Sequence, residues 1–216
     1  MAEAAPQFRE EAFFEYHTYT LERTPTNKDN QTKQISLPRA EAVPVRKELL
    51  FSGSRHYFLG LYGEPERNLK VGVFVELENR KQHNLGMPLP KGTVRVYKQD
   101  SDGSLQFVGE DAIDHTPRDE KVRVRLGEAF DVVVNRKQTD WKKLASDTYE
   151  AAFEIAIRNH KKEDVTVRVV EPVPGDWTML SSTHPWKKGD AFAAEFQIPV
   201  PKDKETKLTY RVRMRY

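Results

Sequence analysis

Apolar and polar residues alternate with a period of two over much of this sequence, and this pattern restricts the fold more than any other feature. The alternation is cleanest in residues 149–157, where every second side chain is apolar. That spacing is typical of a β-strand with one buried face. A polar run at residues 159–164 follows, and the alternation resumes at 165–169. The two segments are therefore predicted to form a hairpin.

Two further alternating segments complete the C-terminal part of the chain. Residues 192–200 and 208–216 each place their apolar side chains on a single face. The predicted inward residues are Phe192, Ala194, Phe196, Ile198, Val200, Leu208, Tyr210, Val212, Met214 and Tyr216. With a fifth strand at 130–134, the spacing predicts an immunoglobulin-like sandwich of antiparallel strands over residues 128–216.

Upstream, shorter alternating runs predict a second and larger β-sandwich over residues 1–127. A hairpin loop at 100–103 joins two of its strands, and Gly103 there is free to adopt positive φ. The predicted strands are 13–21, 33–37, 45–51, 70–77, 93–97, 105–108 and 121–126. Only residues 140–146 are compatible with a short helix. The sequence thus predicts an all-β protein with two antiparallel β-sandwich lobes.

Composition excludes several classes of protein. The 216 residues include no cysteine, which excludes a disulfide framework, thiol catalysis and cysteine-ligated metals. The 35 Lys and Arg nearly balance the 33 Asp and Glu, whereas a dedicated DNA-binding domain is usually strongly basic. No apolar run approaches the roughly 20 residues of a membrane helix. The first residues lack the pattern of a signal peptide, so either the protein is cytoplasmic or a leader precedes this sequence.

An acidic segment at residues 110–120 is the first candidate for chemistry. Asp111, Asp114 and His115 could bind a metal ion or transfer protons, since carboxylates are hard ligands and a neighbouring imidazole is a base. Their spacing matches no established metal loop. The alternative is a turn at residues 115–119 whose polar side chains bind the backbone. No catalytic motif stands out elsewhere, so the sequence predicts a non-enzymatic protein without a cofactor.

Two runs of alternating cations are the second candidate. Arg211, Arg213 and Arg215 share one face of the last predicted strand. Lys121, Arg123 and Arg125 do the same on an earlier strand. If the two strands were neighbours, the six cations would form a surface for carboxylates, sulfates or phosphates. The alternative is a solvated face in which cross-strand glutamates pair with the cations, and Glu150, Glu154 and Glu195 are available.

Tryptophans are the third candidate. Trp177 and Trp186, with Trp141, could form a stacking platform for a sugar at a loop end of the sandwich. The alternative is that they close the core, as aromatic residues usually do in such domains.

Long ordered stretches of the chain resemble the C-terminal half of bacterial mucoidy-inhibitor-like proteins, a region known as a domain of unknown function. The resemblance covers nearly the whole chain. Its residues are FFEYHTYTLERTPTNKDNQTKQISL (13–37), NLGMPLPKGTVRVYKQDSDGSLQFVGEDAIDHTPRDEKVRVRLGEAFDVV (84–133), RKQTDW (136–141), RNHKKEDVTVRVVEPVPGDW (158–177) and YRVRMRY (210–216). Members of that family are generally about twice as long and commonly exported. The resemblance therefore implies an extracytoplasmic location, in the periplasm or at the cell surface, and no established reaction.

Three hypotheses for function follow. The first is a non-catalytic β-sandwich module of a bacterial cell-envelope protein, which self-associates or binds an envelope partner through an exposed edge strand such as 208–216. The second is a binder of acidic polysaccharide or another polyanion through the arginine faces. The third is a metal-assisted hydrolase that uses the acidic segment. None of the three involves nucleic acid or a membrane span.

Overall fold

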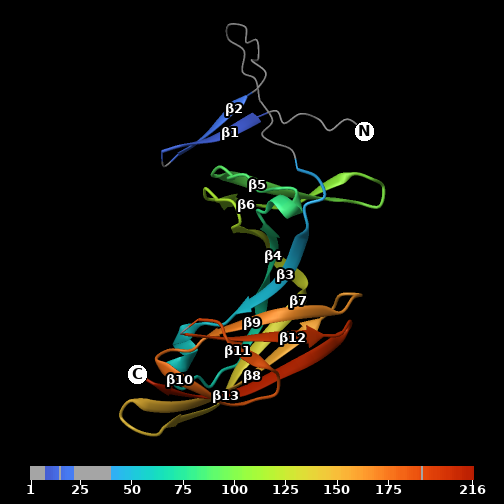
Figure 1. The fold of residues 1–216 in the computed structure, drawn as a ribbon. Helices are drawn as coiled ribbons and strands as arrows, with labels where there is room; N and C mark the ends of the chain where they lie inside the picture. The colour runs from blue at the N-terminus through green and yellow to red at the C-terminus, as the bar shows by residue number, and fades with distance from the viewer. Residues whose placement is uncertain (1–7, 15, 22–39, 191) are drawn as a thin grey trace, which may run out of the picture. The chain divides into compact units, whose positions relative to one another are not determined.

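Strands account for nearly all of the regular structure. The computed structural model describes residues 8–14, 16–21, 40–190 and 192–216, so the strand predicted at 33–37 lies outside the described residues. Two short 3-10 turns, η1 (Arg55–Phe58) and η2 (Lys81–His83), are the helical elements of the described part (Figure 1). The strands are β1 (Phe8–Phe13), β2 (Tyr16–Leu21), β3 (Val45–Ser52), β4 (Glu66–Glu78), β5 (Gly92–Gln99), β6 (Leu105–Ile113), β7 (Lys121–Lys143), β8 (Thr148–Asn159), β9 (Val165–Pro172), β10 (Asp176–Ser182), β11 (Trp186–Lys188), β12 (Ala193–Val200) and β13 (Lys204–Arg215). The predicted all-β, sandwich-like fold is confirmed.

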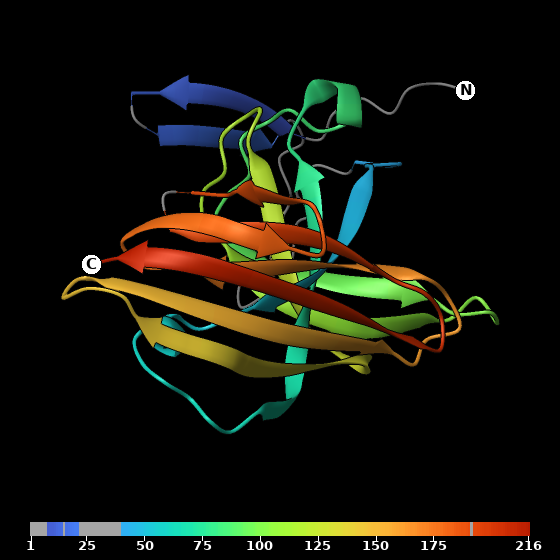
Figure 2. The same cartoon turned by 90° about the horizontal axis from the view of Figure 1, so that it is seen from below.

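Nine of the described strands form the large sheet, in the order β10-β13-β8-β7-β4-β3-β9-β12-β11. Long strands that are neighbours in the sheet, such as β8 and β13, pair antiparallel along their whole length (Figure 2). The sheet is nevertheless mixed, because β3 runs parallel to β9 with Leu49 opposite Val167 and Phe51 opposite Val169. This parallel pair differs from the purely antiparallel prediction, since periodicity reports which side chains share a face and not the direction of the neighbouring strand.

The core contains the alternating residues that the sequence singled out. On β8 and β13 the inward side chains from Ala151 to Ile157 and from Leu208 to Met214 are buried. On β9 and β12 the same holds for Val167, Val169 and the set Ala194, Phe196, Ile198 and Val200. The prediction that Phe192 and Tyr216 point inward is wrong. Each lies just outside its strand and is exposed.

The chain divides into two compact units, and both are assembled from separate stretches. Unit 1 contains Met1–Arg46, Glu76–Val94 and Asp111–Val124, and unit 2 contains Lys47–Val75, Arg95–Glu110 and Arg125–Tyr216. Residues 47–75 thus pack in the same unit as the C-terminal strands, although the predicted division between lobes lay at 127/128. The physical reason is that β3 pairs with β9 and adds Leu49 and Phe51 to the C-terminal core.

Three predicted elements are wrong in detail. Residues 13–21 are two strands, because the chain turns at Phe14 (φ 57°) between β1 and β2. Residues 140–143 belong to β7 rather than to a helix, since they pair with β8 beyond a bulge between Gln138 and Asp140. Residues 204–215 form a central strand, not an edge: β13 lies between β10 and β8. The hypothesis that residues 208–216 bind a partner as an exposed edge strand is therefore wrong.

Candidate binding surfaces

Strands β5 and β6 form a separate two-stranded ribbon. Its loop is closed by a hydrogen bond from the Asp100 amide to the Ser104 carbonyl (2.8 Å), and Gly103 adopts φ 90°. Among the strands that the structure describes, neither β5 nor β6 has a second neighbour in a sheet. Near its base the ribbon approaches β7 closely, because a Cβ on Gly109 would lie 2.5 Å from the Leu126 carbonyl oxygen. The outer part of the ribbon has no such cover.

The ribbon exposes large apolar side chains. Leu105 is 69% exposed, Phe107 56%, Tyr97 51% and Val108 42%. The rings of Tyr97 and Phe107 meet edge to face with centroids 5.6 Å apart. On β6, Leu105 and Phe107 share one face, and Val108 lies on the other. We call Leu105, Phe107 and Tyr97 the ribbon patch. Isolated two-stranded sheets are marginally stable in water, and contiguous exposed apolar groups are typical of interaction sites.

The three arginines of β13 are engaged in ion pairs. Arg211 donates to Asp140 (2.7 Å), Arg213 donates twice to Glu150 (2.8 and 3.0 Å), and Arg215 donates to Asp147 (2.8 Å). The Arg211 hydrogen bond lowers the pKa of Asp140 below its ordinary value, and Arg215 does the same for Asp147. A polyanion would therefore compete with these carboxylates for the three guanidinium groups.

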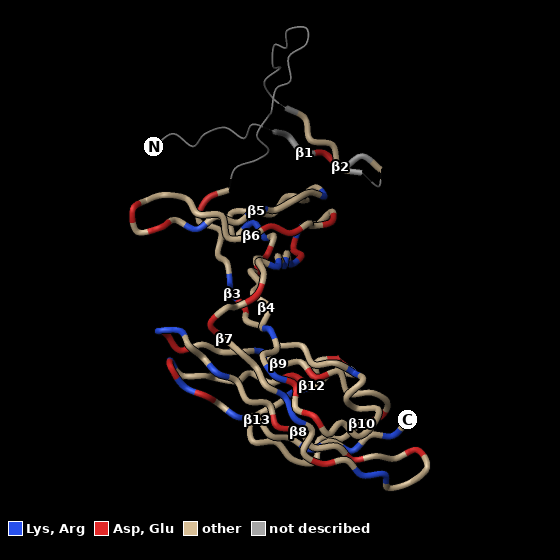
Figure 3. Tube along the Cα trace, turned by 180° about the vertical axis from the view of Figure 1, so that it is seen from behind, with Lys and Arg blue, Asp and Glu red and all other residues tan. Residues whose placement is uncertain are grey.

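Arg123 and Arg125 lie on β7, and β7 is not a neighbour of β13. Arg125 pairs with Glu128 at 3.7 Å, and Lys121 pairs with Glu76 at 3.5 Å. The predicted surface of six neighbouring cations therefore does not form. Positive and negative residues are instead interspersed along the strands (Figure 3).

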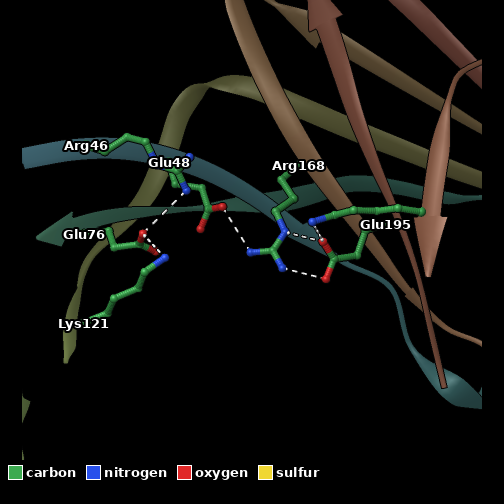
Figure 4. Close-up of polar contacts among 7 residues, drawn as sticks. Arg46, Glu48, Glu76, Lys121, Arg168 and Glu195 are labelled. Carbon is green, nitrogen blue, oxygen red and sulfur yellow. Dashed lines mark hydrogen bonds and ion pairs between the residues drawn. The ribbon is translucent and has the colours of Figure 1, made fainter. Parts of the chain in front are cut away.

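Glutamates on the sheet hold cations in the same way. In unit 2, Arg168 donates to Glu195 (2.8 Å) and to Glu48 (3.2 Å), and Lys187 lies 3.3 Å from Glu195 (Figure 4). In unit 1, Glu76 forms ion pairs with Arg46 at 3.7 Å and with Lys121 at 3.5 Å (Figure 4). Glu150, Glu154 and Glu195, the glutamates expected from the sequence, each have such a partner.

Two of the predicted tryptophans meet. The ring centroids of Trp177 and Trp186 are 5.5 Å apart, and the Lys188 ammonium lies 5.2 Å from the centre of the Trp177 ring. Trp177 is buried, whereas Trp186 is 42% exposed. Trp141 stacks instead on Tyr149 at 5.5 Å. Stacked rings cover each other's faces, so this second group extends the core rather than presenting a flat platform.

The acidic segment does not form a metal-ligand cluster. Asp114 is 87% exposed and pairs with Lys91 (3.0 Å), while the Lys91 amide donates to His115 Nδ1 (3.3 Å). The Asp111 carboxylate accepts the amide of Ala112. No group of three or more His, Asp or Glu side chains within the described ranges could hold a metal ion. His115 does line a hollow of about 300 Å³ in unit 1, with Tyr19 and Pro117 among its other walls.

The structure also reveals residues that the sequence did not indicate. The sequence predicts the ribbon only as ordinary strands, because alternation indicates which side chains share a face but not whether that face is covered. Likewise Arg136 and Glu171 occupy inward positions of β7 and β9 and form a buried ion pair at 2.8 Å. A charged residue in an otherwise apolar inward series is the one signal that could have identified them.

Comparisons with known proteins found no relative. No family model, no curated protein and no solved structure matches this chain. In the portion of the chain that is described, no helix is long and apolar enough to cross a membrane.

Proposed function

We propose that this chain is a non-catalytic binding and assembly module of a bacterial cell-envelope protein, and that it binds a second copy of itself through the β5–β6 ribbon. The observation that carries the proposal is the ribbon patch. Its three apolar side chains lie on a two-stranded sheet whose strands have free edges in the described structure. The location in the envelope rests on the family resemblance of the sequence.

A second copy is a suitable partner because the two strands of the ribbon carry opposite charges. β5 carries Arg95 and Lys98, and β6 carries Glu110 and Asp111. Within one copy Arg95 donates to Glu110 at 2.9 Å, so these two side chains can pair across adjacent strands. The edge of β5 in one copy can therefore meet β6 of another without like charges in register. Such a head-to-tail contact builds a ring or a filament.

The other two hypotheses have less support. A polyanion would have to displace the carboxylates that already hold Arg211, Arg213 and Arg215. A metal-assisted hydrolase would have to recruit ligands from side chains that are turned toward separate partners.

The test is the solution mass by light scattering of the wild type and of the double variant Leu105→Lys/Phe107→Lys. We expect an oligomer or filament for the wild type, and association at least about tenfold weaker for the variant, because each lost apolar contact contributes roughly 1.5–3 kcal/mol. The matched control is Leu61→Lys, which changes an equally exposed apolar residue (73%) in a loop of unit 2. A monomeric wild type, or equal weakening by the control, would overturn the proposal.

A further inference from the structure

The outer face of the sheet in unit 2 contains a hollow of about 260 Å³, and Ala156 is one of the residues that line it. The strand register explains its position. Asn135 of β7 and Lys207 of β13 lie directly opposite Ala156 of β8, one on either side. In the next row Lys137 lies opposite Glu154. A methyl group between longer polar side chains leaves the surface depressed at this point.

The walls of the hollow are polar and are fixed by the sheet. Arg67 and Pro65 border it from the β4 side, and Glu205 borders it from β13. The side-chain oxygen Oδ1 of Asn135 accepts hydrogen bonds from the backbone N–H of Asn68 (3.0 Å) and from a guanidinium N–H of Arg158 (3.4 Å). The two remaining donors of Asn135 are the N–H groups of its side-chain amide. A site on paired strands is held more rigidly than one on a loop.

The charges of the lining leave one cation in excess. Lys207 pairs with Glu154 at 3.5 Å. Arg136 also lines the hollow, and its charge is balanced by the buried Glu171 at 2.8 Å. Arg67 and Lys137 take part in no ion pair within the described part of the chain, and Glu205 is the one remaining carboxylate of the lining. Two cations against one carboxylate give a net charge of +1 at the hollow.

We propose that this hollow is a binding site for a small monocarboxylate. Arg67 and Lys137 supply the charge, because an N⁺–H···O⁻ hydrogen bond is roughly twice as strong as a neutral one. The Asn135 amide supplies a neutral donor. The single excess charge matches a monoanion, whereas a dianion would meet the carboxylates of Glu154 and Glu205. The site is separate from the ribbon patch and does not depend on the proposed assembly.

The experiment is a titration of the ¹⁵N-labelled chain with sodium acetate, followed by the amide shifts of residues 135, 137, 156 and 207. Sodium chloride at the same ionic strength and sodium phosphate are the comparison ligands. We expect saturable shifts with acetate that are absent with chloride and weaker with phosphate. Arg67→Ala/Lys137→Ala should weaken binding about tenfold, and Ala156→Val, which fills the hollow, should abolish the saturable shifts.

The matched control is Lys142→Ala, which removes one cation from the same strand outside the hollow. It should leave the acetate affinity within about twofold of the wild type. Each variant is first compared with the wild type by its amide spectrum, so that misfolding is not taken for loss of binding. The proposal is overturned if acetate and chloride give the same unsaturated shifts, or if Lys142→Ala weakens binding as much as the double variant.

Discussion

The buried pair of Arg136 and Glu171 is the most unusual pair of residues in the core of unit 2. Arg136 is 2% exposed and Glu171 is fully buried. The Arg136 guanidinium lies 4.3 Å from the ring centres of both Tyr57 and Phe153, so aromatic faces replace its water. Burial raises the pKa of Glu171 above its ordinary value, and the charge of Arg136 opposes that shift. A Cβ on Gly53 would lie 2.6 Å from the Glu171 carboxylate, which leaves room for glycine alone.

Removal of one partner of this pair should cost far more than removal of both. Arg136→Met leaves a buried carboxylate without a counterion, and we expect about 3–5 kcal/mol of lost stability. The double variant Arg136→Met/Glu171→Leu replaces the pair with apolar groups and should recover most of that loss. The free energies of unfolding from urea titrations of the two single variants and the double variant check this. Additive losses in the double variant would contradict the account.

The ion pair of Arg168 with the buried Glu195 supplies a prediction about pH. The hydrogen bond from Arg168 lowers the pKa of Glu195, and Lys187 adds to that effect. A depressed carboxylate contributes stability above its unfolded pKa of about 4.3 and loses that contribution as the pH falls through its folded pKa. In Arg168→Gln the pKa of Glu195 should rise toward the ordinary value. Carboxyl-carbon NMR titration of both proteins measures it, and an unchanged pKa would show that Arg168 is not the cause.

Among the strands, β7 contains a glycine, Gly127, whose backbone conformation other residues rarely adopt. β7 runs without interruption from Lys121 to Lys143, and Gly127 adopts φ 136° within it. Open space surrounds the position of an added Cβ, so the cost of Gly127→Ala comes from the backbone alone. We expect about 1–3 kcal/mol of destabilisation by thermal or urea unfolding. Gly92→Ala in β5, which also has open space but ordinary φ, is the control and should be nearly neutral. Equal losses of stability in Gly127→Ala and Gly92→Ala would contradict the claim that the backbone at Gly127 is strained by a side chain.

The elements that the sequence predicted well are those with one continuously buried face. Alternation located β8, β9, β12 and β13 because nearly all of their inward residues are apolar, with Glu171 at the end of β9 as an exception. β10 and β11 were missed, since DWTMLSS alternates poorly and β11 has only three residues. β7 was read as two strands because Gly127 resembles a break. The ion pairs of Glu150, Glu154 and Glu195 could be anticipated from cross-strand spacing, but the central position of β13 could not, because strand order depends on contacts far apart in the sequence.

Across the described part of the molecule, most charged groups of the large sheet are paired within the chain, and the ribbon patch is the surface that we propose binds another protein. The carboxylates of the large sheet form ion pairs with neighbouring cations, whereas the side chains of Leu105, Phe107 and Tyr97 are exposed to solvent. Assembly would also stabilise β5 and β6, because a third strand converts a marginal ribbon into a sheet.

Hydrogen exchange of the backbone amides, followed by mass spectrometry at rising protein concentration, tests this claim most directly. The amides of residues 95–110 should exchange more slowly as the concentration rises, while those of β13, which already have partners on both sides, should not change. Exchange in the ribbon that stays the same from dilute to concentrated protein would contradict the account, and protection that appears on another element would identify a different interface.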